Sequence, residues 1–359
     1  MVGIRTVFLC NRPGFNQYDI RNPAVERDIM ENMAVSLQDI LSAEKRIRPY
    51  IYHTPMLRGK GMDERLGCQV YLKPEMLQIT GAFKLRGALS KILSLTPDEL
   101  KKGIITSSSG NHGQACAYVG QLLGIRTTVV IPEDAPAIKI EKARAMGAEV
   151  IVWDRLYSER MKKIGEEVAE HGYAIVHAFE DYTVMAGQGT IALEILDELP
   201  DVETAVVPIG GGGLISGIST ALKESKPDVR VIGVQAAACA AYYASRQNGC
   251  PTAVQSLPTL ADGLACVRPG KHPYPIIEKY VDEIVIVDEE DIMDAVRFVA
   301  DGAKLVGEPS ACVGIAALLA DKVKTRPDEK VCSVLTSGNW DIDKIGRIFN
   351  RESVAGVQR

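Results

Sequence analysis

The sequence predicts an α/β protein with two lobes, each built on a parallel-rich sheet that is flanked by helices. Short apolar strand patterns alternate with helical patterns from residue 103 to residue 177, and a second series runs from residue 187 to residue 335. This alternation is typical of parallel sheets covered by helices on both faces. With 359 residues, 46% of them hydrophobic, the chain is long enough for one large core or two modest ones.

The first elements follow from local signals. Residues 1–35 contain turn-forming residues without sustained periodicity, so we expect an N-terminal extension of unknown role. A helix is expected after Ser36, because Asp39 completes a capping box and apolar residues recur at helical spacing up to Ile47. A short strand at 70–73 then precedes a helical pattern that begins near Lys84.

The two alternating series follow. In the first, strands are expected at 103–106, 127–131, 149–153 and 174–177, with helices at 112–123, 137–146 and 158–171. In the second, helices are expected at 191–199, 214–224, 289–305 and 311–323, with strands at 205–208, 229–235 and 331–335, the last of which completes the sheet. Between about residues 238 and 272 the alternation lapses, and this long irregular stretch is expected to shape the mouth of a substrate site.

Composition narrows the class of partner. The net charge is -5 without a block of like charge, so nucleic acid and membrane surfaces are not expected as partners. The eight cysteines form no Cys-x-x-Cys pair and are expected to be small core residues in a reducing cytosol. The apolar run at 6–10 is too short for a signal peptide, and no apolar run of about 18 residues occurs. We therefore expect a cytoplasmic protein without a metal-finger site.

Lys84 is the first candidate for chemistry. It stands between a glycine turn at Gly81 and an apolar run, Leu85 to Leu93, that predicts the buried face of a helix. A lysine partly removed from water loses preference for its charged form, and its neutral amine can form a Schiff base with a carbonyl. Taken alone, a lysine at a helix start is more often a surface residue whose amine reaches water.

Four consecutive glycines form the second candidate. Gly210, Gly211, Gly212 and Gly213 lie between a strand and a helix, where converging backbone amides and a helix N-terminus favour a phosphate. A dinucleotide-binding Gly-x-Gly-x-x-Gly motif does not fit, because Ile215 or Ser216 falls at the third glycine position. A flexible turn without a ligand is the alternative.

Two further strand ends carry polar loops. Ser108, Ser109, Gly110, Asn111 and His112 lie where hydroxyls and amides are suited to a carboxylate, although a plain helix cap explains each residue singly. No Gly-x-Ser-x-Gly motif supports a hydrolase triad. The stretch Thr336-Ser337-Gly338-Asn339 ends the last predicted strand, where ligands of open parallel sheets bind, and a hydroxyl there is suited to a heterocyclic nitrogen.

Together these stretches resemble the fold-type II enzymes that use pyridoxal 5'-phosphate, most closely the branch of threonine and serine dehydratases and serine racemase. The resemblance runs from about Leu37 to Ile345. It implies a large lobe of residues 36–102 plus 181–350 that binds the cofactor, a small lobe of residues 103–180 with the substrate loop, and a tail of residues 351–359. It also implies a homodimer.

The resemblance also implies roles. Lys84 would carry the cofactor and, once released, remove the substrate α-proton, while Ser109 would act as acid or base on the opposite face. The remaining cofactor contacts would come from Phe83, Asn111, Gly210, Gly211, Gly212, Gly213 and Thr336. The substrate carboxylate would be bound by Ser108, Ser109, Gly110, Asn111 and His112.

The sequence departs from the family pattern in three respects. Ala82 replaces a serine, which is expected to make the pocket less polar and to shift substrate choice. Thr336 replaces the ring-nitrogen serine of a Ser-Gly-Gly-Asn motif. Gln235 and Ala241 stand where relatives with a divalent-cation site have carboxylates, so we expect no magnesium there; tight magnesium binding in calorimetry would contradict this.

The function expected first is a cofactor-dependent dehydratase, an ammonia-lyase that converts a β-hydroxy amino acid such as L-threonine or L-serine to a 2-oxo acid and ammonia by α,β-elimination. Without a C-terminal regulatory domain, a degradative enzyme is expected. The alternatives are an amino acid racemase acting on serine, a dehydratase specific for 3-hydroxyaspartate or another β-hydroxy amino acid, and a pyridoxal-phosphate-binding protein without turnover.

Overall fold

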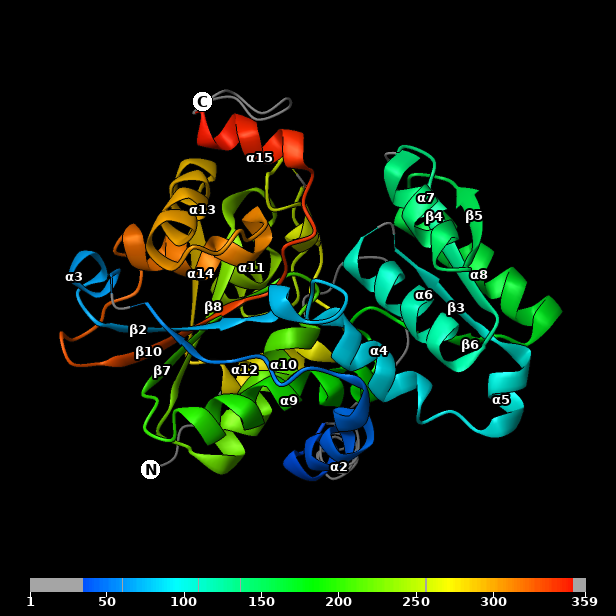
Figure 1. Cartoon of the computed structure of the whole chain (residues 1–359), viewed down its shortest axis with the longest axis horizontal. Helices are drawn as coiled ribbons and strands as arrows, with labels where there is room; N and C mark the ends of the chain where they lie inside the picture. The colour runs from blue at the N-terminus through cyan, green and yellow to red at the C-terminus, as the bar shows by residue number, and fades with distance from the viewer. Residues whose placement is uncertain (1–34, 60, 109, 136, 256, 351–359) are drawn as a thin grey trace.

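The computed structural model describes residues 35–59, 61–108, 110–135, 137–255 and 257–350. Residues 1–34 of the predicted N-terminal extension, the tail and the predicted catalytic Ser109 lie outside the described residues. Figure 1 shows two bodies side by side, one built around a larger sheet and one around a smaller sheet. No helix of the described ranges is both long and apolar enough to cross a membrane.

The larger sheet has six strands in the order β1-β2-β10-β7-β8-β9. Its strands are β1 (Leu57–Arg58), β2 (Gln69–Pro74), β7 (Thr204–Pro208), β8 (Arg230–Ala236), β9 (Glu283–Val287) and β10 (Lys330–Leu335). All pairs are parallel except β1 with β2. The last strand, β10, lies inside the sheet between β2 and β7, so it joins the start of the chain to the second series rather than adding an edge.

The smaller sheet has four parallel strands in the order β5-β4-β3-β6. They are β3 (Ile104–Ser107), β4 (Thr127–Pro132), β5 (Glu149–Trp153) and β6 (Ala174–Ile175). The strand predicted at 174–177 is two residues shorter, because the Nδ1 atom of His177 accepts the backbone N–H groups of Phe179 and Glu180 and turns the chain. The residue boundaries that we predict for the two lobes stay a prediction.

Helices cover both sheets. They are α2 (Leu37–Ile47), α3 (Asp63–Leu66), α4 (Lys84–Ile92), α5 (Pro97–Lys102), α6 (Asn111–Leu123), α7 (Ala137–Ala145), α8 (Tyr157–His171), α9 (Tyr182–Glu198), α10 (Gly213–Ser225), α11 (Ala241–Asn248), α12 (Pro273–Tyr280), α13 (Glu289–Ala303), α14 (Pro309–Leu319) and α15 (Ile342–Phe349). Four short 3-10 turns join them, η1 (Arg48–Tyr50), η2 (Glu75–Leu77), η3 (Ala237–Cys239) and η4 (Asp262–Leu264). The predicted capping box of Ser36 and Asp39 is present at the start of α2.

Two predictions about helices are wrong. The helix predicted at 191–199 begins nine residues earlier, because Asp181 caps α9 and accepts from the N–H groups of Thr183 and Val184. The stretch 238–272, predicted to be irregular, contains the helix α11. The apolar signal of α11 is weak because only three of its eight residues, Ala241, Tyr242 and Ser245, are buried.

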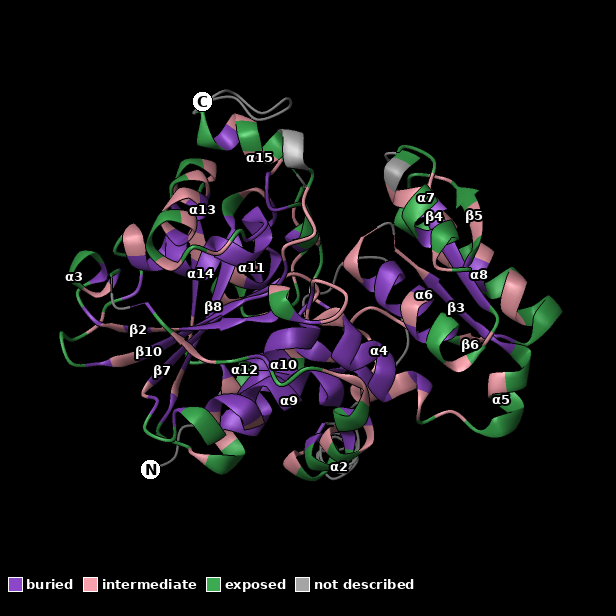
Figure 2. Cartoon of the chain, in the orientation of Figure 1, coloured by how far each residue is buried: buried purple, intermediate pink, exposed green. Residues whose placement is uncertain are grey.

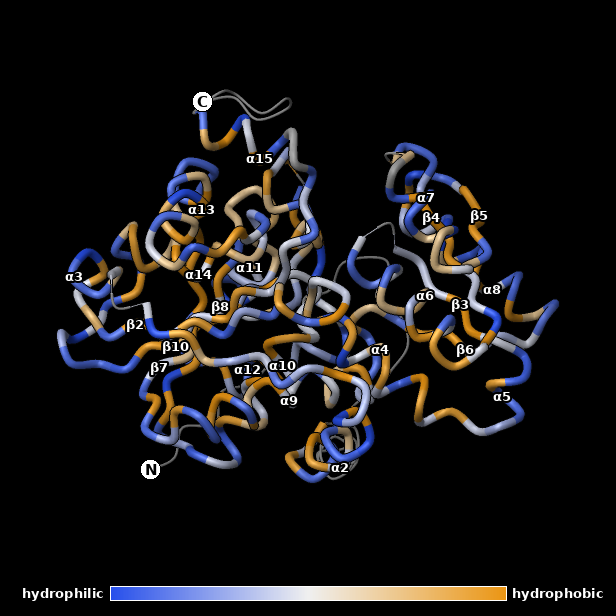
Figure 3. The backbone as a smooth tube through the Cα atoms, viewed as in Figure 1, coloured by the Kyte–Doolittle hydropathy of each residue, from blue (hydrophilic) through white to orange (hydrophobic). Residues whose placement is uncertain are grey.

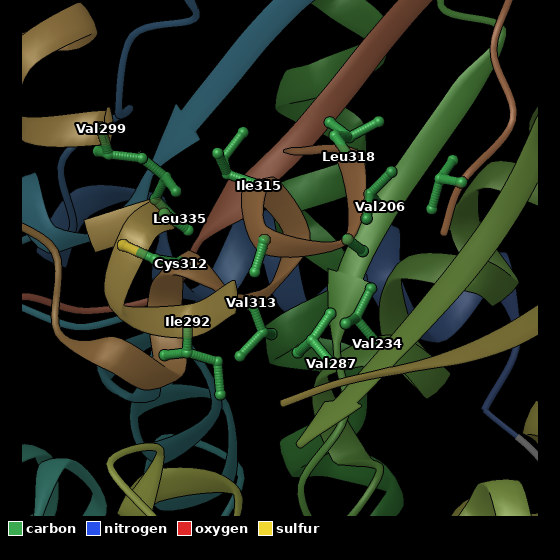
Figure 4. Close-up of a cluster of buried hydrophobic side chains, with 14 of the residues drawn as sticks. Val206, Val234, Val287, Ile292, Val299, Cys312, Val313, Ile315, Leu318 and Leu335 are labelled. Atoms are coloured by element: carbon green, nitrogen blue, oxygen red, sulfur yellow. The ribbon is translucent and has the colours of Figure 1, made fainter. Parts of the chain in front are cut away.

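The core of the larger body lies on both faces of its sheet. On one face α13 and α14 pack against β7, β8 and β9 through Val206, Val234 and Val287, as Figure 4 shows. On the other face α2, α9, α10 and α12 cover the same strands. Both α9 and α10 are drawn as mostly buried in Figure 2, and the central strands contain hydrophobic stretches in Figure 3. Burial on both faces explains the continuous apolar runs of these strands.

Candidate active site

A cavity of about 390 Å³ lies between the two bodies. Its lining includes residues at the carboxyl ends of three parallel strands: Ser107 at the end of β3, Pro208 at the end of β7 and Thr336 directly after β10. Carboxyl ends of parallel strands are the usual ligand sites of open α/β sheets. The four stretches that the sequence singles out, around Lys84, Asn111, Gly211 and Thr336, all contribute to the lining.

Lys84 is the first residue of α4 and is partly buried in this cavity. Its Nζ donates a hydrogen bond to the Ala178 carbonyl (3.0 Å) and lies 5.0 Å from the centre of the Phe83 ring. Removal from water lowers the pKa of Lys84 to about 8. No carboxylate of the described residues forms an ion pair with it, so near neutral pH a useful fraction of this amine is uncharged.

Buried charges hold the helix that begins with Lys84. Arg86 is fully buried, and its guanidinium binds Glu75 (Nη2 to Oε1, 2.8 Å) and Glu194 (Nη1 to Oε1, 2.6 Å). Lys73, also fully buried, binds the other oxygen of Glu194 at 2.7 Å. Since these partners come from β2, η2 and α9, the first turn of α4 is tied to three other segments of the larger body.

The glycine stretch is a tight loop in front of α10. Cβ atoms at Gly211 and Gly213 would overlap Phe179, and Gly212 has a φ of 96°, which side-chain-bearing residues rarely adopt. Only glycine therefore fits, and the backbone comes close to the cavity. The first amides of α10 have no acceptor within the helix, so the loop presents N–H groups and positive potential to the cavity.

The loop after β3 supplies Ser108 and Gly110 to the cavity wall, and the first turn of α6 supplies Asn111 and His112. The Ser108 hydroxyl accepts from the Gly110 N–H (3.2 Å), as a turn-forming serine does. The His112 Nε2 donates to the Val176 carbonyl (2.9 Å), and burial lowers the pKa of His112 to about 3, so the ring is neutral. Its Nδ1 is buried without a partner among the described residues.

A buried carboxylate links this loop to the end of β10. The Nδ2 of Asn111 donates to Glu308 (3.2 Å to Oε1), and the Ser337 hydroxyl donates to the same oxygen (2.5 Å). Asn339 donates to the Oδ1 of Asn111 (2.9 Å) and to the Thr80 carbonyl (2.7 Å). One network therefore connects the loop after β3, the loop before Lys84 and the loop after β10.

Glu308 is one of the cavity residues that the sequence motifs do not indicate. It is 7% exposed, precedes Pro309 at the start of α14 and lines the cavity. Burial, as the largest effect, raises the pKa of Glu308 to about 7, with Asp262 adding to the rise. A glutamate directly before a helix-starting proline is a weak signal, since such a residue is often only an exposed first-turn carboxylate.

Phe83 and Thr336 are both placed at the cavity. The Phe83 N–H donates to the Thr336 carbonyl (3.0 Å), and the Thr336 hydroxyl lies 3.2 Å from that of Ser337. Ala82 is fully buried, forms a backbone bridge with Ser337 and is not among the cavity-lining residues. The expected effect of Ala82 on pocket polarity therefore has no basis in the geometry. The roles predicted for the other site residues stay predictions.

The smaller body adds a polar wall that the sequence analysis also missed. Arg160 of α8 donates to the Ser107 hydroxyl (3.1 Å) and to the Asp154 carbonyl (3.0 Å). Beside it, the Tyr157 hydroxyl lies 2.7 Å from the Nε2 of His177. The side chains of Arg160, Tyr157 and His177 all line the cavity. No salt bridge joins Arg160 to a carboxylate within the part of the chain that is described.

Gln235, at the position where relatives with a cation site have a carboxylate, forms a hydrogen bond through its side-chain amide. The Tyr243 N–H donates to Gln235 Oε1 (2.9 Å), which ties the end of β8 to α11. Among the described residues no cluster of three histidine, cysteine or acidic side chains is suited to a metal. The cysteine prediction is partly wrong, because Cys250 and Cys266 are only partly buried, whereas Cys68, Cys116, Cys239, Cys312 and Cys332 are buried.

The cavity combines a lysine of lowered pKa with a glycine loop that is suited to an anion, at the carboxyl ends of parallel strands. This combination is typical of the class of pyridoxal-phosphate enzymes with two α/β lobes. The model of the family "Pyridoxal-phosphate dependent enzyme" matches residues 47–337, so the chain belongs to that family.

Relatives agree with this membership. The chain is 43% identical to an L-threonine ammonia-lyase of Thermotoga maritima over 317 residues, which are 88% of this chain and 79% of the relative. The structure of the present chain is similar to that of maize serine racemase, with a TM-score of 0.84 and 33% sequence identity; the match covers 89% of this chain and 98% of the maize chain. A threonine deaminase from T.th. has a TM-score of 0.80 and 38% identity, over 85% and 99% of the two chains.

The residues present fit the cofactor. The glycine loop lines the cavity directly in front of α10, whose first amides have no acceptor within the helix, so a phosphate can bind there. Lys84 lies in the same cavity with a pKa of about 8, as a lysine that condenses with an aldehyde requires. Thr336 and Asn111 add neutral polar groups to that cavity.

Proposed function

We propose that this chain is a pyridoxal-phosphate-dependent ammonia-lyase that converts a β-hydroxy amino acid, such as L-threonine or L-serine, to the corresponding 2-oxo acid and ammonia. The single observation that carries the proposal is the Lys84 amine, partly buried in a cavity that it shares with the glycine loop and Asn111. The named activities of the threonine ammonia-lyase and the threonine deaminase described above support it.

The chemistry divides between cofactor and chain. When bound, pyridoxal phosphate supplies an electron sink that stabilises negative charge at the substrate Cα. The glycine loop would hold the phosphate through the amides in front of α10. Lys84 would hold the cofactor aldehyde, and as a neutral amine it would take the proton from the substrate Cα. The β-hydroxyl would leave with a proton as water, and hydrolysis would consume one water to give the 2-oxo acid and ammonia.

The chain also sets the surroundings of this step. The loop from Ser108 to His112 binds the substrate carboxylate through hydroxyl and backbone groups, with His112 held neutral behind it. Asn111 is fixed by Glu308 and Asn339, so its amide approaches the cofactor in one orientation. Ser109 is proposed as the acid or base on the face opposite Lys84. We further propose that the protein is a cytoplasmic homodimer, which is supported by the family resemblance alone. Size-exclusion chromatography with light scattering would test the oligomeric state.

The direct experiment measures 2-oxo acid release from L-threonine, L-serine and 3-hydroxyaspartate in the presence of pyridoxal phosphate. Lys84→Ala is the matched control, because it removes the amine and leaves the cavity. We expect turnover that the variant loses. Racemised serine without 2-oxo acid would move the assignment to the racemase alternative, to which serine racemase similarity points. A bound cofactor with neither product would indicate a binding protein.

Arg160 favours a second candidate, a dehydratase of 3-hydroxyaspartate. Its guanidinium lines the cavity and its partners there are a hydroxyl and carbonyl groups, so it can accept a substrate carboxylate. We expect Arg160→Met to lower kcat/KM for 3-hydroxyaspartate by about tenfold or more, the value of a charged hydrogen bond, and to leave that for L-threonine nearly unchanged. Equal losses for both substrates would contradict this second candidate.

A further inference from the structure

Three side chains form a short chain of hydrogen bonds at one end of the cavity. The Thr336 hydroxyl lies 3.2 Å from the Ser337 hydroxyl, which lies 2.5 Å from Oε1 of Glu308. Thr336, Ser337 and Glu308 all line the cavity and are all less than 9% exposed. The middle hydroxyl, Ser337, departs from the motif that this stretch resembles, Ser-Gly-Gly-Asn, which has glycine at that position.

The direction of the hydrogen bonds depends on the carboxyl group. A hydroxyl has one hydrogen to donate, and an ionised carboxylate only accepts. When Glu308 is ionised, Ser337 donates to it, so Thr336 donates to Ser337 and presents only lone pairs to the cavity. When Glu308 carries a proton, it can donate to Ser337, Ser337 to Thr336, and Thr336 then presents its hydrogen to the cavity. One proton gained from solvent thus reverses the whole chain.

We propose that Glu308 is a positioning residue which, through Ser337, sets whether Thr336 offers a hydrogen-bond acceptor or a donor to the ring nitrogen of bound pyridoxal phosphate. The proposal rests on the proposed function and on the predicted place of Thr336 beside that nitrogen. An acceptor stabilises a protonated ring nitrogen and a donor stabilises an unprotonated one. The strength of the electron sink therefore changes with the protonation of Glu308.

The charged groups around Glu308 suit a titration near neutral pH. Asp262 of η4 raises the pKa of Glu308 and Lys139 of α7 lowers it, and these two residues form an ion pair with each other (3.6 Å). Asn111 of α6 donates to the carboxylate, and the thiol of Cys312 on α14 is neutral because burial raises its pKa. Burial is the largest effect on Glu308 and brings its pKa to about 7.

The test compares visible absorption spectra of the cofactor-loaded enzyme between pH 5.5 and 8.5. We expect one spectral transition near pH 7 in the wild type. Glu308→Gln removes the titrating group, and Ser337→Gly keeps it but removes the link, so both should lose most of the transition. Ser333→Ala is the matched control, because Ser333 is a buried hydroxyl in β10 that does not line the cavity; it should keep the transition unchanged.

A second readout needs neither turnover nor cofactor. In the full-length chain with glutamate labelled by carbon-13 at the carboxyl, the Glu308 resonance is assigned by its loss in Glu308→Gln. We expect it to titrate near pH 7, and at higher pH in Ser337→Gly because a donor to the carboxylate is lost. This separates the proposal from the proposed function, whose failure would appear as a loaded enzyme that releases no 2-oxo acid.

Each other result overturns the proposal. A spectral transition that persists in Glu308→Gln would assign it to another group, such as the Lys84 amine. A transition that survives in Ser337→Gly would show that Glu308 acts without the hydroxyl link. A wild-type spectrum that is flat across the range, or a Glu308 carboxyl that titrates below pH 5.5, would show that the chain does not reverse at working pH.

Discussion

At the scale of single residues, the side chains that hold the site are more deeply buried than those proposed to react. Arg86, Glu75 and Lys73 are fully buried, whereas Lys84 is only partly buried. A buried cation is tolerated only where carboxylates neutralise it and satisfy its hydrogens, and the forked contact of Arg86 with two glutamates does both. These residues fix the backbone beside Lys84 while leaving its amine free to react.

Replacing Arg86 by methionine should destabilise the protein strongly. The variant keeps most of the side-chain volume but leaves Glu75 without its cation and Glu194 with only one of two, in a place that excludes water. We expect the free energy of unfolding in urea to fall by about 3–5 kcal/mol. Arg126→Met is the control, because Arg126 pairs with Glu149 at the surface, where a salt bridge contributes about 1 kcal/mol or less. Equal losses in the two variants would contradict the role of Arg86.

Glu308 should make stability depend on pH. Its folded-state pKa of about 7 lies above the unfolded value of about 4.5, so its contribution is fully present below pH 4.5 and is lost as the pH rises through 7. The wild type should therefore lose about 3 kcal/mol from this group by pH 8, whereas Glu308→Gln loses none of it. Urea unfolding of the cofactor-free chain at pH 5 and pH 8 measures the difference, and parallel pH profiles of the two proteins would refute it.

At the scale of elements, small residues decide how closely the helices around the site approach. A Cβ at Gly187 in α9 would lie 2.5 Å from the Arg86 carbonyl in α4, and one at Gly189 would lie 2.8 Å from the Gly217 carbonyl in α10. Gly187 and Gly189 are therefore the points at which α9 packs closely on α4 and α10. Close packing of these helices places α4 and the glycine loop on the same cavity.

Two alanine substitutions in helices should therefore change stability in opposite directions. Gly187→Ala forces α9 away from α4, and overpacking of this kind costs about 1–3 kcal/mol. Gly165→Ala in α8 meets nothing within 4 Å and should stabilise by up to about 1 kcal/mol, the helix preference of alanine over glycine. Thermal unfolding measures both. A stabilised Gly187→Ala would mean that α9 and α4 are not in this close contact.

At the scale of the whole molecule, the site exists only where the two bodies meet. Asn111, the first residue of α6 in the smaller body, forms hydrogen bonds with Glu308 and Asn339, which lie about 200 residues further along the chain. Glu180, after β6, accepts the backbone N–H of His272 (2.9 Å), which adds a second polar contact between segments on either side of the cavity. A ligand in the cavity touches both bodies and should couple their stabilities.

Cofactor removal should lower the stability of the molecule as a whole. At a pyridoxal phosphate concentration 100 times the Kd, binding to the folded chain alone adds about 2.7 kcal/mol to the free energy of unfolding. We expect one cooperative thermal transition that moves to higher temperature with cofactor, and a smaller shift in Lys84→Ala at the same concentration. If the loaded and cofactor-free chains had the same Tm, the cavity would not be the cofactor site.

The fold class, the order of most strands and helices, and three loops at strand ends could all be predicted from the amino-acid sequence. These follow from signals a few residues long: apolar periodicity, the capping box at Ser36, and glycines at a strand-to-helix junction. Family membership followed from the same short motifs, and the comparisons confirm it.

Which side chains those loops contact became clear from the folded chain alone. The interior place of β10, the early start of α9 and the helix α11 depend on partners distant in sequence. The places of Glu308 and Arg160 at the cavity also depend on distant partners. Nothing in the local sequence shows that a glutamate before a proline is buried, or that an arginine in an amphipathic helix faces a cavity. The pKa values of about 7 for Glu308 and about 8 for Lys84 arise because both side chains are removed from water. Segments distant in sequence exclude that water, so the local sequence does not specify these pKa values.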